Sequence, residues 1–248
     1  MRMRRCVAAL AASVVLLATA PTAGAATKPA KASTPITSLK AFAFSVNVAA
    51  TGAANALGSS LTLASTGVFV APANQDCSVT AALGKITQDQ QLVVIGKKTW
   101  VDSGNGLEPA KASDFDFADF CPSSPGFWKG FAVKPPTVNT PTKEVKNGIA
   151  ALGYDAGSDK SALSGFKALG DLPSDVVLSG LQLWFAVRGG YLVSAQLRLS
   201  SSVAASCTSL TSASPLPLQA PCTVDVSYDL SRPGDKTLAV TAPKIAKK

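Results

Sequence analysis

The residue types that usually carry catalysis are scarce in this chain. No histidine occurs among its 248 residues, which excludes Ser-His-Asp triads, Cys-His pairs and histidine-ligated zinc. There is no Gly-x-Ser-x-Gly motif, and no Asp/Glu pair stands out for glycosidic chemistry. Asp114, Asp116 and Asp119 form a loose acidic cluster without the spacing of a calcium loop, so we interpret them as a solvated helix face. The sequence therefore predicts a protein that is not an enzyme and holds no metal or cofactor.

Cysteine is the remaining residue type with chemistry of its own. Of the five cysteines, Cys6 lies in the N-terminal targeting segment, which leaves Cys77, Cys121, Cys207 and Cys222. No Cys-x-x-Cys spacing supports a metal site, whereas an even number of cysteines in an exported chain predicts two disulfides. Three pairings can be drawn. We favour Cys77–Cys121 with Cys207–Cys222, because sequential pairing closes two local loops.

Residues 1–25 have the features of a secretory signal peptide. Three arginines within the first five residues precede an apolar run over residues 6–20, and Ala23-Gly24-Ala25 supplies the small-x-small pattern of a cleavage site. The apolar run is short for a membrane-spanning helix, which needs about 20 residues. We expect cleavage after Ala25 and export to the cell envelope or the extracellular space.

Charge restricts the partners of the mature chain. Cleavage lowers the formal net charge from +8 to +5, because residues 1–25 contain three arginines and no acid. A modest positive surplus suits transient contact with an anionic membrane surface. The basic residues are scattered and aromatic residues make up only 6% of the chain, which argues against a nucleic-acid groove.

One β-rich domain is expected over residues 40–243, between a flexible linker at 26–39 and a basic tail at 244–248. A strand pair with a turn at Asn147-Gly148 is predicted over residues 145–155. Helices are expected near residues 113–131 and over 158–170, and 200–221 is interpreted as a Ser/Pro-rich loop. In total, about nine or ten antiparallel strands are expected. Besides the strand pair over 145–155, the alternation of apolar and polar residues predicts strands over residues 41–48, 60–70, 77–86, 91–95, 98–102, 180–187, 191–199, 223–230 and 237–241.

The fold class implied is α+β, a large curved antiparallel sheet with a few helices over its apolar face. Two helices are too few to cover that face completely, and an incompletely filled apolar interior can hold a hydrophobic ligand. The aromatic cluster of Phe115, Phe117, Phe120, Phe127, Trp128 and Phe131 either lines or gates the mouth of such a cavity or is plain core. Trp184 lies on the face of its strand opposite Leu183 and Phe185. The candidate lining residues are Phe42, Phe44, Leu61, Leu63, Phe69, Phe115, Phe120, Phe127, Trp128, Leu163, Phe166, Leu183, Phe185, Val193, Ala195 and Leu197.

Several segments together resemble the LolA-like half-barrel carriers, especially the LppX/LprG-type lipid-binding proteins of bacterial envelopes. The resembling segments are residues 67–72 (GVFVAP), 92–96 (LVVIG), 98–102 (KTWVD), 147–154 (NGIAALGY) and 181–193 (LQLWFAVRGGYLV). The resemblance implies an eleven-strand curved sheet with helices on its concave side and a cavity for acyl chains. The chain departs from the lipoprotein subset because no Leu-x-x-Cys lipobox precedes the mature N-terminus, so no lipid anchor is expected.

Two function classes therefore lead. The first is non-enzymatic binding and carriage of lipids or acylated molecules, which needs a connected apolar void on the order of several hundred Å³. The second is an exported structural or interaction module whose β-core is fully packed and which carries no lipid.

Overall fold

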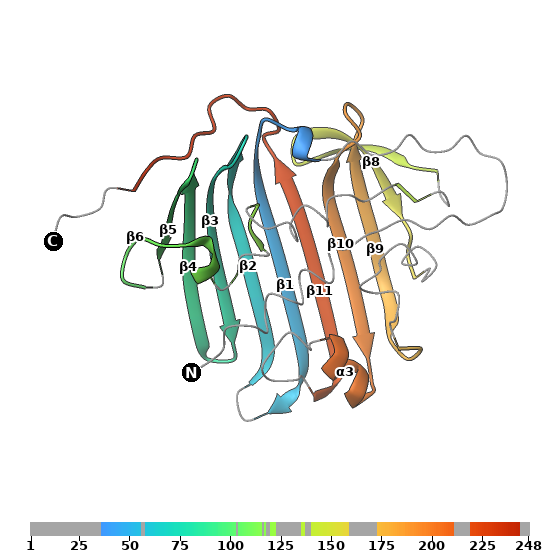
Figure 1. Ribbon diagram of the computed structural model, residues 1–248. Helices are drawn as coiled ribbons and strands as arrows, with labels where there is room; N and C mark the ends of the chain where they lie inside the picture. The colour runs from blue at the N-terminus through green and yellow to red at the C-terminus, as the bar shows by residue number, and fades with distance from the viewer. Residues whose placement is uncertain are drawn as a thin grey trace.

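Eleven strands form one open antiparallel sheet in the computed structural model (Figure 1). The structure describes residues 36–55, 58–102, 104–115, 117, 120–122, 135–136, 140–158, 173–210 and 219–243. The strands are β1 (Ala41–Asn55), β2 (Gly58–Val70), β3 (Asn74–Leu83), β4 (Ile86–Ile95), β5 (Lys98–Asp102), β6 (Glu108–Pro109), β7 (Thr142–Lys146), β8 (Ile149–Asp155), β9 (Val177–Ala186), β10 (Leu192–Ser201) and β11 (Gln219–Ser231). Their order across the sheet is β6-β5-β4-β3-β2-β1-β11-β10-β9-β8-β7. The chain thus makes two meanders that join where β1 lies beside β11.

The strands form because their residues alternate between an apolar and a polar series. Along β11, every second residue from Cys222 to Leu230 is buried while the residues between them are half-exposed. Pairing of β1 with β11 and β2 aligns the apolar series of neighbouring strands, because directly opposed residues point to the same side of a sheet. The predicted fold class, a large curved antiparallel half-barrel sheet, is confirmed.

Glycine and asparagine form the turns of two hairpins, of which the first was predicted from the sequence. Asn147 and Gly148, between β7 and β8, have φ of 53° and 77°, the positive values that a two-residue type I′ turn requires. Gly189 and Gly190, between β9 and β10, have φ of 88° and 65°. These turns return the chain along the neighbouring strand and so fix the register of each hairpin.

Three short helices lie among the described residues. They are the 3₁₀ helices η1 (Ile36–Ser38) and η2 (Ala112–Asp114), and the α-helix α3 (Ala204–Leu210) at one end of β10 and β11 (Figure 1). None of these has the length and hydropathy needed to cross a membrane. The helix expected over 158–170 and most of the one expected near 113–131 lie outside the described residues.

Several sequence expectations about the bounds and number of elements were wrong. The segment 200–221 is not a simple loop, because it contains α3 and the start of β11. The strand expected over 77–86 is instead the end of β3 and a turn at Gly84, where φ is 57°, and β4 begins at Ile86 rather than at 91. The segment 237–241 forms no strand, and the strands number eleven, including the unpredicted two-residue β6.

Side-chain hydrogen bonds explain why the segment around residue 237 turns instead of extending. The carboxylate of Asp235 accepts hydrogen bonds from the backbone N–H of Thr237 at 2.8 Å and from its hydroxyl at 2.7 Å. Such local bonds offer the backbone an alternative to a sheet ladder. They lower the pKa of Asp235 to about 2, and the Arg232 side chain contributes a further hydrogen bond.

Both predicted disulfides are present. Cys77 on β3 is bonded to Cys121, with 5.9 Å between their Cα atoms. Cys207 on α3 is bonded to Cys222 on β11, with a Cα separation of 5.8 Å. The second bond fastens α3 to the end of the sheet, and the first fastens a non-strand segment onto the apolar face.

Candidate functional site

The apolar face of the sheet is continuous across both meanders. Phe42 on β1 lies opposite Phe69 on β2, with their ring centroids 5.3 Å apart. Phe44 lies opposite Leu230 on β11, and its ring centroid is 6.3 Å from that of Phe42. These four side chains are at most 5% exposed. The join between β1 and β11 therefore lies within the apolar face and does not interrupt it.

The same face continues across β9 and β10. Leu183 on β9 lies opposite Ala195 on β10, which lies opposite Tyr228 on β11. The ring of Phe185 packs edge-on against that of Tyr154 on β8, with centroids 5.8 Å apart. Burial raises the pKa of the Tyr228 phenol well above its ordinary value, so this hydroxyl stays neutral.

Most of the sequence-predicted lining residues contribute to this face or pack onto it. Cross-strand register and burial place nine on it: Phe42, Phe44, Leu61, Leu63, Phe69, Leu183, Phe185, Ala195 and Leu197. Val193 is fully buried at a β-bulge in β10. Phe115 and Phe120 are buried in the same core from outside the strands. Phe127, Trp128, Leu163 and Phe166, and the neighbouring Phe131, lie outside the described residues.

A short segment that contains Phe117 and Phe120 is anchored to the apolar face at β2 and β3. The hydroxyl of Ser65, on β2, donates a 2.9 Å hydrogen bond to the carbonyl oxygen of Phe120. The adjacent Cys121 forms the disulfide with Cys77. Phe117 and Phe120 are at most 4% exposed. For these two rings, burial favours the core interpretation over a gate.

Gln75 on β3 is a polar exception that sequence reasoning missed. It lies on the apolar face, opposite Phe69 and Val94, and is 1% exposed. Neither its amide nitrogen nor its amide oxygen has a hydrogen-bond partner in the part of the chain that the structure describes. An unsatisfied buried polar group costs about 1–3 kcal/mol. One sequence feature could have indicated its position: Gln75 lies two residues before Cys77 on β3, so both side chains point to the same face.

Trp184 lies on the opposite, polar face, as its place in the alternation predicted. Its indole N–H donates a 2.5 Å hydrogen bond to the Glu144 carboxylate on β7. The ammonium group of Lys146 lies 4.0 Å from the ring centroid. Within the described residues, Trp184 is therefore held by side chains of β7, the edge strand of this half of the sheet.

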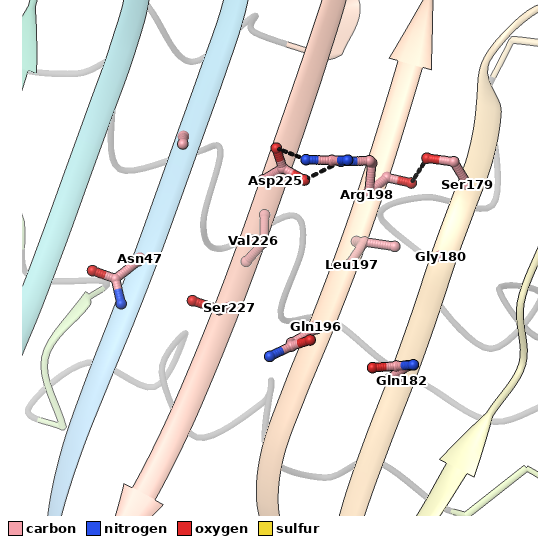
Figure 2. A pocket seen from close by; sticks show the side chains of 11 residues that line it. Asn47, Ser179, Gly180, Gln182, Gln196, Leu197, Arg198, Asp225, Val226 and Ser227 are labelled. Atoms are coloured by element: carbon pink, nitrogen blue, oxygen red, sulfur yellow. Dashed lines mark hydrogen bonds and ion pairs between the residues drawn. The ribbon is translucent and has the colours of Figure 1, made fainter.

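The polar face also carries a shallow pocket of about 430 Å³ in the middle of the sheet. Figure 2 shows its side chains on β1, β11, β10 and β9, with an ion pair between Arg198 and Asp225 at one side. Sequence reasoning did not predict it, because alternation shows which residues face solvent but not where a sheet is hollowed. Among the described residues, no group of His, Cys, Asp and Glu is arranged to hold a metal ion.

Known proteins similar to this chain are found among solved structures and not by sequence. No protein-family model matches the chain, and no curated protein matches it. Similar solved structures include LprF from Mycobacterium bovis, with 15% identity, a TM-score of 0.38, and coverage of 84% of this chain and 90% of LprF. They also include a LolA superfamily protein from Nitrosomonas europaea, with 9% identity, a TM-score of 0.26, and coverage of 90% and 91%. Similarity this low assigns no ligand to the chain.

Proposed function

We propose that this domain binds the acyl chain of a lipid or acylated molecule against its apolar face, without covalent chemistry, and carries it in the bacterial cell envelope or outside the cell. The observation that supports the proposal is the continuous apolar face of an open sheet. Its aromatic and aliphatic side chains can remove the apolar surface of a hydrocarbon ligand from water.

The length of the face suits an acyl chain. On β1, the apolar series runs from Phe42 to Ala50, a span of about 26 Å at roughly 3.3 Å per residue. Two leaflets of acyl chains fill a hydrocarbon core about 30 Å thick, so one chain is shorter than this face. Each methylene that is buried contributes roughly 0.8 kcal/mol, so one long chain gives useful affinity before any headgroup contact.

Gln75 supports a ligand that also has a polar linkage. Its carboxamide offers both a donor and an acceptor within the apolar face, beside Phe69 at the same end of the sheet as Phe42. An ester or amide carbonyl at one end of an acyl chain would satisfy the amide N–H groups. A ligand of this kind would pair a polar group that the described residues leave without a partner.

The second candidate is an exported module with a packed core and no cargo. The near-complete burial of Phe42 and Phe120, at 0% and 1% exposure, favours it. Under the carrier proposal, an acyl chain must replace some of the contacts that bury these side chains. The two functions therefore differ in whether the protein leaves its host with lipid bound.

The proposed place of action rests on two features. Residues 1–25 have a signal-peptide pattern that predicts cleavage after Ala25, and two disulfides are typical of proteins in oxidising compartments. The proposed partners are the lipid itself and, transiently, a membrane surface that donates or accepts it.

Native mass spectrometry of the protein purified from its own host tests the carrier function directly. We expect a lipid adduct of defined mass on the folded protein, and uptake of labelled lipid from vesicles after the adduct is removed. A protein without an adduct that also takes up no lipid would contradict the proposal and favour the packed module.

A larger side chain on the apolar face sharpens that test. Ala195 is half-buried between Leu183 and Tyr228, so Ala195→Trp should lower lipid occupancy several-fold while the protein still folds. Ala82→Trp is the matched control, because Ala82 is equally half-buried but points to the polar face of β3. Equal lipid occupancy in the two variants would place the lipid somewhere other than the apolar face.

A further inference from the structure

The pocket on the polar face is crossed by a row of hydrogen-bonding side chains from four adjacent strands. Gln182 on β9 is directly opposite Gln196 on β10, which is opposite Ser227 on β11, which is opposite Asn47 on β1. Figure 2 shows these side chains side by side along the pocket. Three carboxamides and one hydroxyl therefore form one line across the middle of the sheet.

Hydrogen bonding differs between these four side chains and the charged groups beside them. None of them forms a side-chain hydrogen bond with another residue in the part of the chain that the structure describes. The charges beside them are used: both carboxylate oxygens of Asp225 accept from the Arg198 guanidinium, at 2.5 and 2.9 Å. Among the described residues, the pocket therefore offers neutral polar groups without a hydrogen-bond partner, while its two opposite charges compensate each other.

The pocket is hollow because small residues occupy both ends of the adjacent row of paired residues, which also contains Arg198 and Asp225. Gly180 on β9 lies opposite Arg198, and Ala49 on β1 lies opposite Asp225. A Cβ atom added at Gly180 would meet no atom within 4 Å. The volume of about 430 Å³ is within the range of about 300–1,000 Å³ that is typical of small-molecule sites.

The chemistry of the free groups selects the kind of ligand. Each carboxamide presents two donor hydrogens and an acceptor oxygen, and the serine hydroxyl also donates and accepts. Sugar hydroxyls match this pattern, since each can donate and accept. A phosphate or carboxylate only accepts and would lie near the carbonyl oxygens of the amides and the Asp225 carboxylate. A hydrocarbon would leave the row of polar groups desolvated without partners.

The position of the row argues against a peptide ligand. Extended peptides usually bind a sheet by adding a strand to its edge. Here β1, β11, β10 and β9 are paired on both sides, and the edge strands are β6 and β7. A ligand in this pocket must therefore be bound by side chains rather than by backbone groups.

We propose that the pocket formed by Asn47, Gln182, Gln196 and Ser227 on the polar face binds a neutral saccharide. This site is separate from the apolar face, and the inference does not depend on acyl-chain binding. The affinity should be weak, with a Kd on the order of 1 mM, because the pocket is open and has no aromatic ring among its lining residues.

Saturation-transfer NMR on the mature protein tests the proposal with glucose, mannose, galactose and maltose as probes. Glucose 6-phosphate serves as the anionic comparison and triglycine as the peptide comparison. We expect saturation transfer to at least one neutral sugar, and weaker or no transfer to the two comparison compounds. Absence of transfer to every sugar would overturn the proposal, and stronger transfer to triglycine would replace it with a peptide site.

Two variants locate the binding in the pocket. Gly180→Tyr should fill the hollow without a clash, and Gln196→Ala should remove the central carboxamide; each should weaken sugar binding at least tenfold. Ser78→Tyr is the matched control, because Ser78 lies on β3, is exposed on the same polar face of the sheet and does not line the pocket. Circular dichroism spectra should be the same for all four proteins. Sugar binding that survives Gly180→Tyr would show that the ligand lies elsewhere.

Discussion

The two faces of the sheet are built from the same strands and differ in how their side chains are satisfied. On β11, Val224 and Val226 are buried on one side, while Asp225 and Ser227 are half-exposed on the other. Packing therefore stabilises the apolar face, and hydrogen bonds with water are open to much of the polar face. A ligand on the first face must displace packing contacts, whereas a ligand on the second must replace water.

Each face has an exception that sharpens the contrast. Gln75 brings into the apolar face an amide that has no hydrogen-bond partner among the described residues. On the polar face, Trp184 is only 8% exposed and Ser194 is fully buried, because the polar face is covered where β7 contacts it. The turn residue Asn147 also donates a 2.9 Å hydrogen bond to the Asp229 carboxylate of β11. The open part of the polar face therefore begins beyond this covered end.

The largest expected difference between the faces is in stability. Phe42→Ala should lower the free energy of unfolding by about 3–5 kcal/mol, because it leaves a cavity beside Phe44 and Phe69. Thr62→Ala, at an exposed position on the polar face of β2, should change it by less than about 0.5 kcal/mol. Denaturant unfolding monitored by fluorescence measures both. Comparable effects would show that the apolar face is not the core of the protein.

Removal of either disulfide should have the next largest effect on the free energy of unfolding. Each bond reduces the entropy of the unfolded chain, so losing Cys77–Cys121, with a sequence separation of 44, should destabilise by about 4 kcal/mol. Losing Cys207–Cys222, with a separation of 15, should destabilise by about 3 kcal/mol. Paired Cys→Ala variants in chemical unfolding check this order. The reverse order would indicate that the α3 attachment matters more than loop length.

Gln75→Met should change the free energy of unfolding by less, and in the opposite direction. Replacing an unpartnered buried amide by an apolar side chain of similar shape should raise the free energy of unfolding by about 1 kcal/mol. Gln90→Met is the control, because Gln90 is also buried on the apolar face but has an interaction partner, so that variant should be destabilised. If the carrier proposal holds, Gln75→Met should also weaken binding of ester lipids more than that of plain hydrocarbons. Destabilisation by both substitutions would mean that the Gln75 amide is satisfied in solution.

The smallest effect is expected on the polar face. Arg198 and Asp225 form an ion pair whose side chains are 60% and 42% exposed. Exposed pairs of this kind contribute little and are screened by salt. Arg198→Ala should therefore leave the Tm almost unchanged at physiological ionic strength, and any remaining difference should vanish in 1 M NaCl. A large, salt-resistant loss would show that the pair organises the sheet.

Local patterns were sufficient to predict most of the sheet. The alternation from Phe42 to Val48 and from Thr223 to Leu230 assigned the right residues to the apolar face, because a strand with one buried face has a strict period of two. Asn147-Gly148 predicted the β7–β8 turn, since both residues tolerate positive φ. The disulfide pairing also followed from proximity along the sequence.

The missed features depend on neighbours that are distant in sequence or on weak local signals. The first half of β4, residues 86–90, is polar on both faces apart from the exposed Ile86, so alternation did not reveal it. The two-residue β6 exists only through pairing with Trp100 and Val101. The pocket requires Gly180 on β9 and Ala49 on β1 to lie on the same face with β10 and β11 between them. None of these relations is encoded within a short window of sequence.

The pairing of β1 with β11 also constrains the order of folding. Ala43 pairs with Ser231, so the centre of the sheet joins the first strand of the domain to the last. Closing so long a loop is entropically unfavourable and is associated with slow folding. Until residue 231 is available, β1 and β10 each present an unpaired edge that can associate with other chains. A chain cut short before β11 would therefore lose the contact between its two halves and be prone to aggregation.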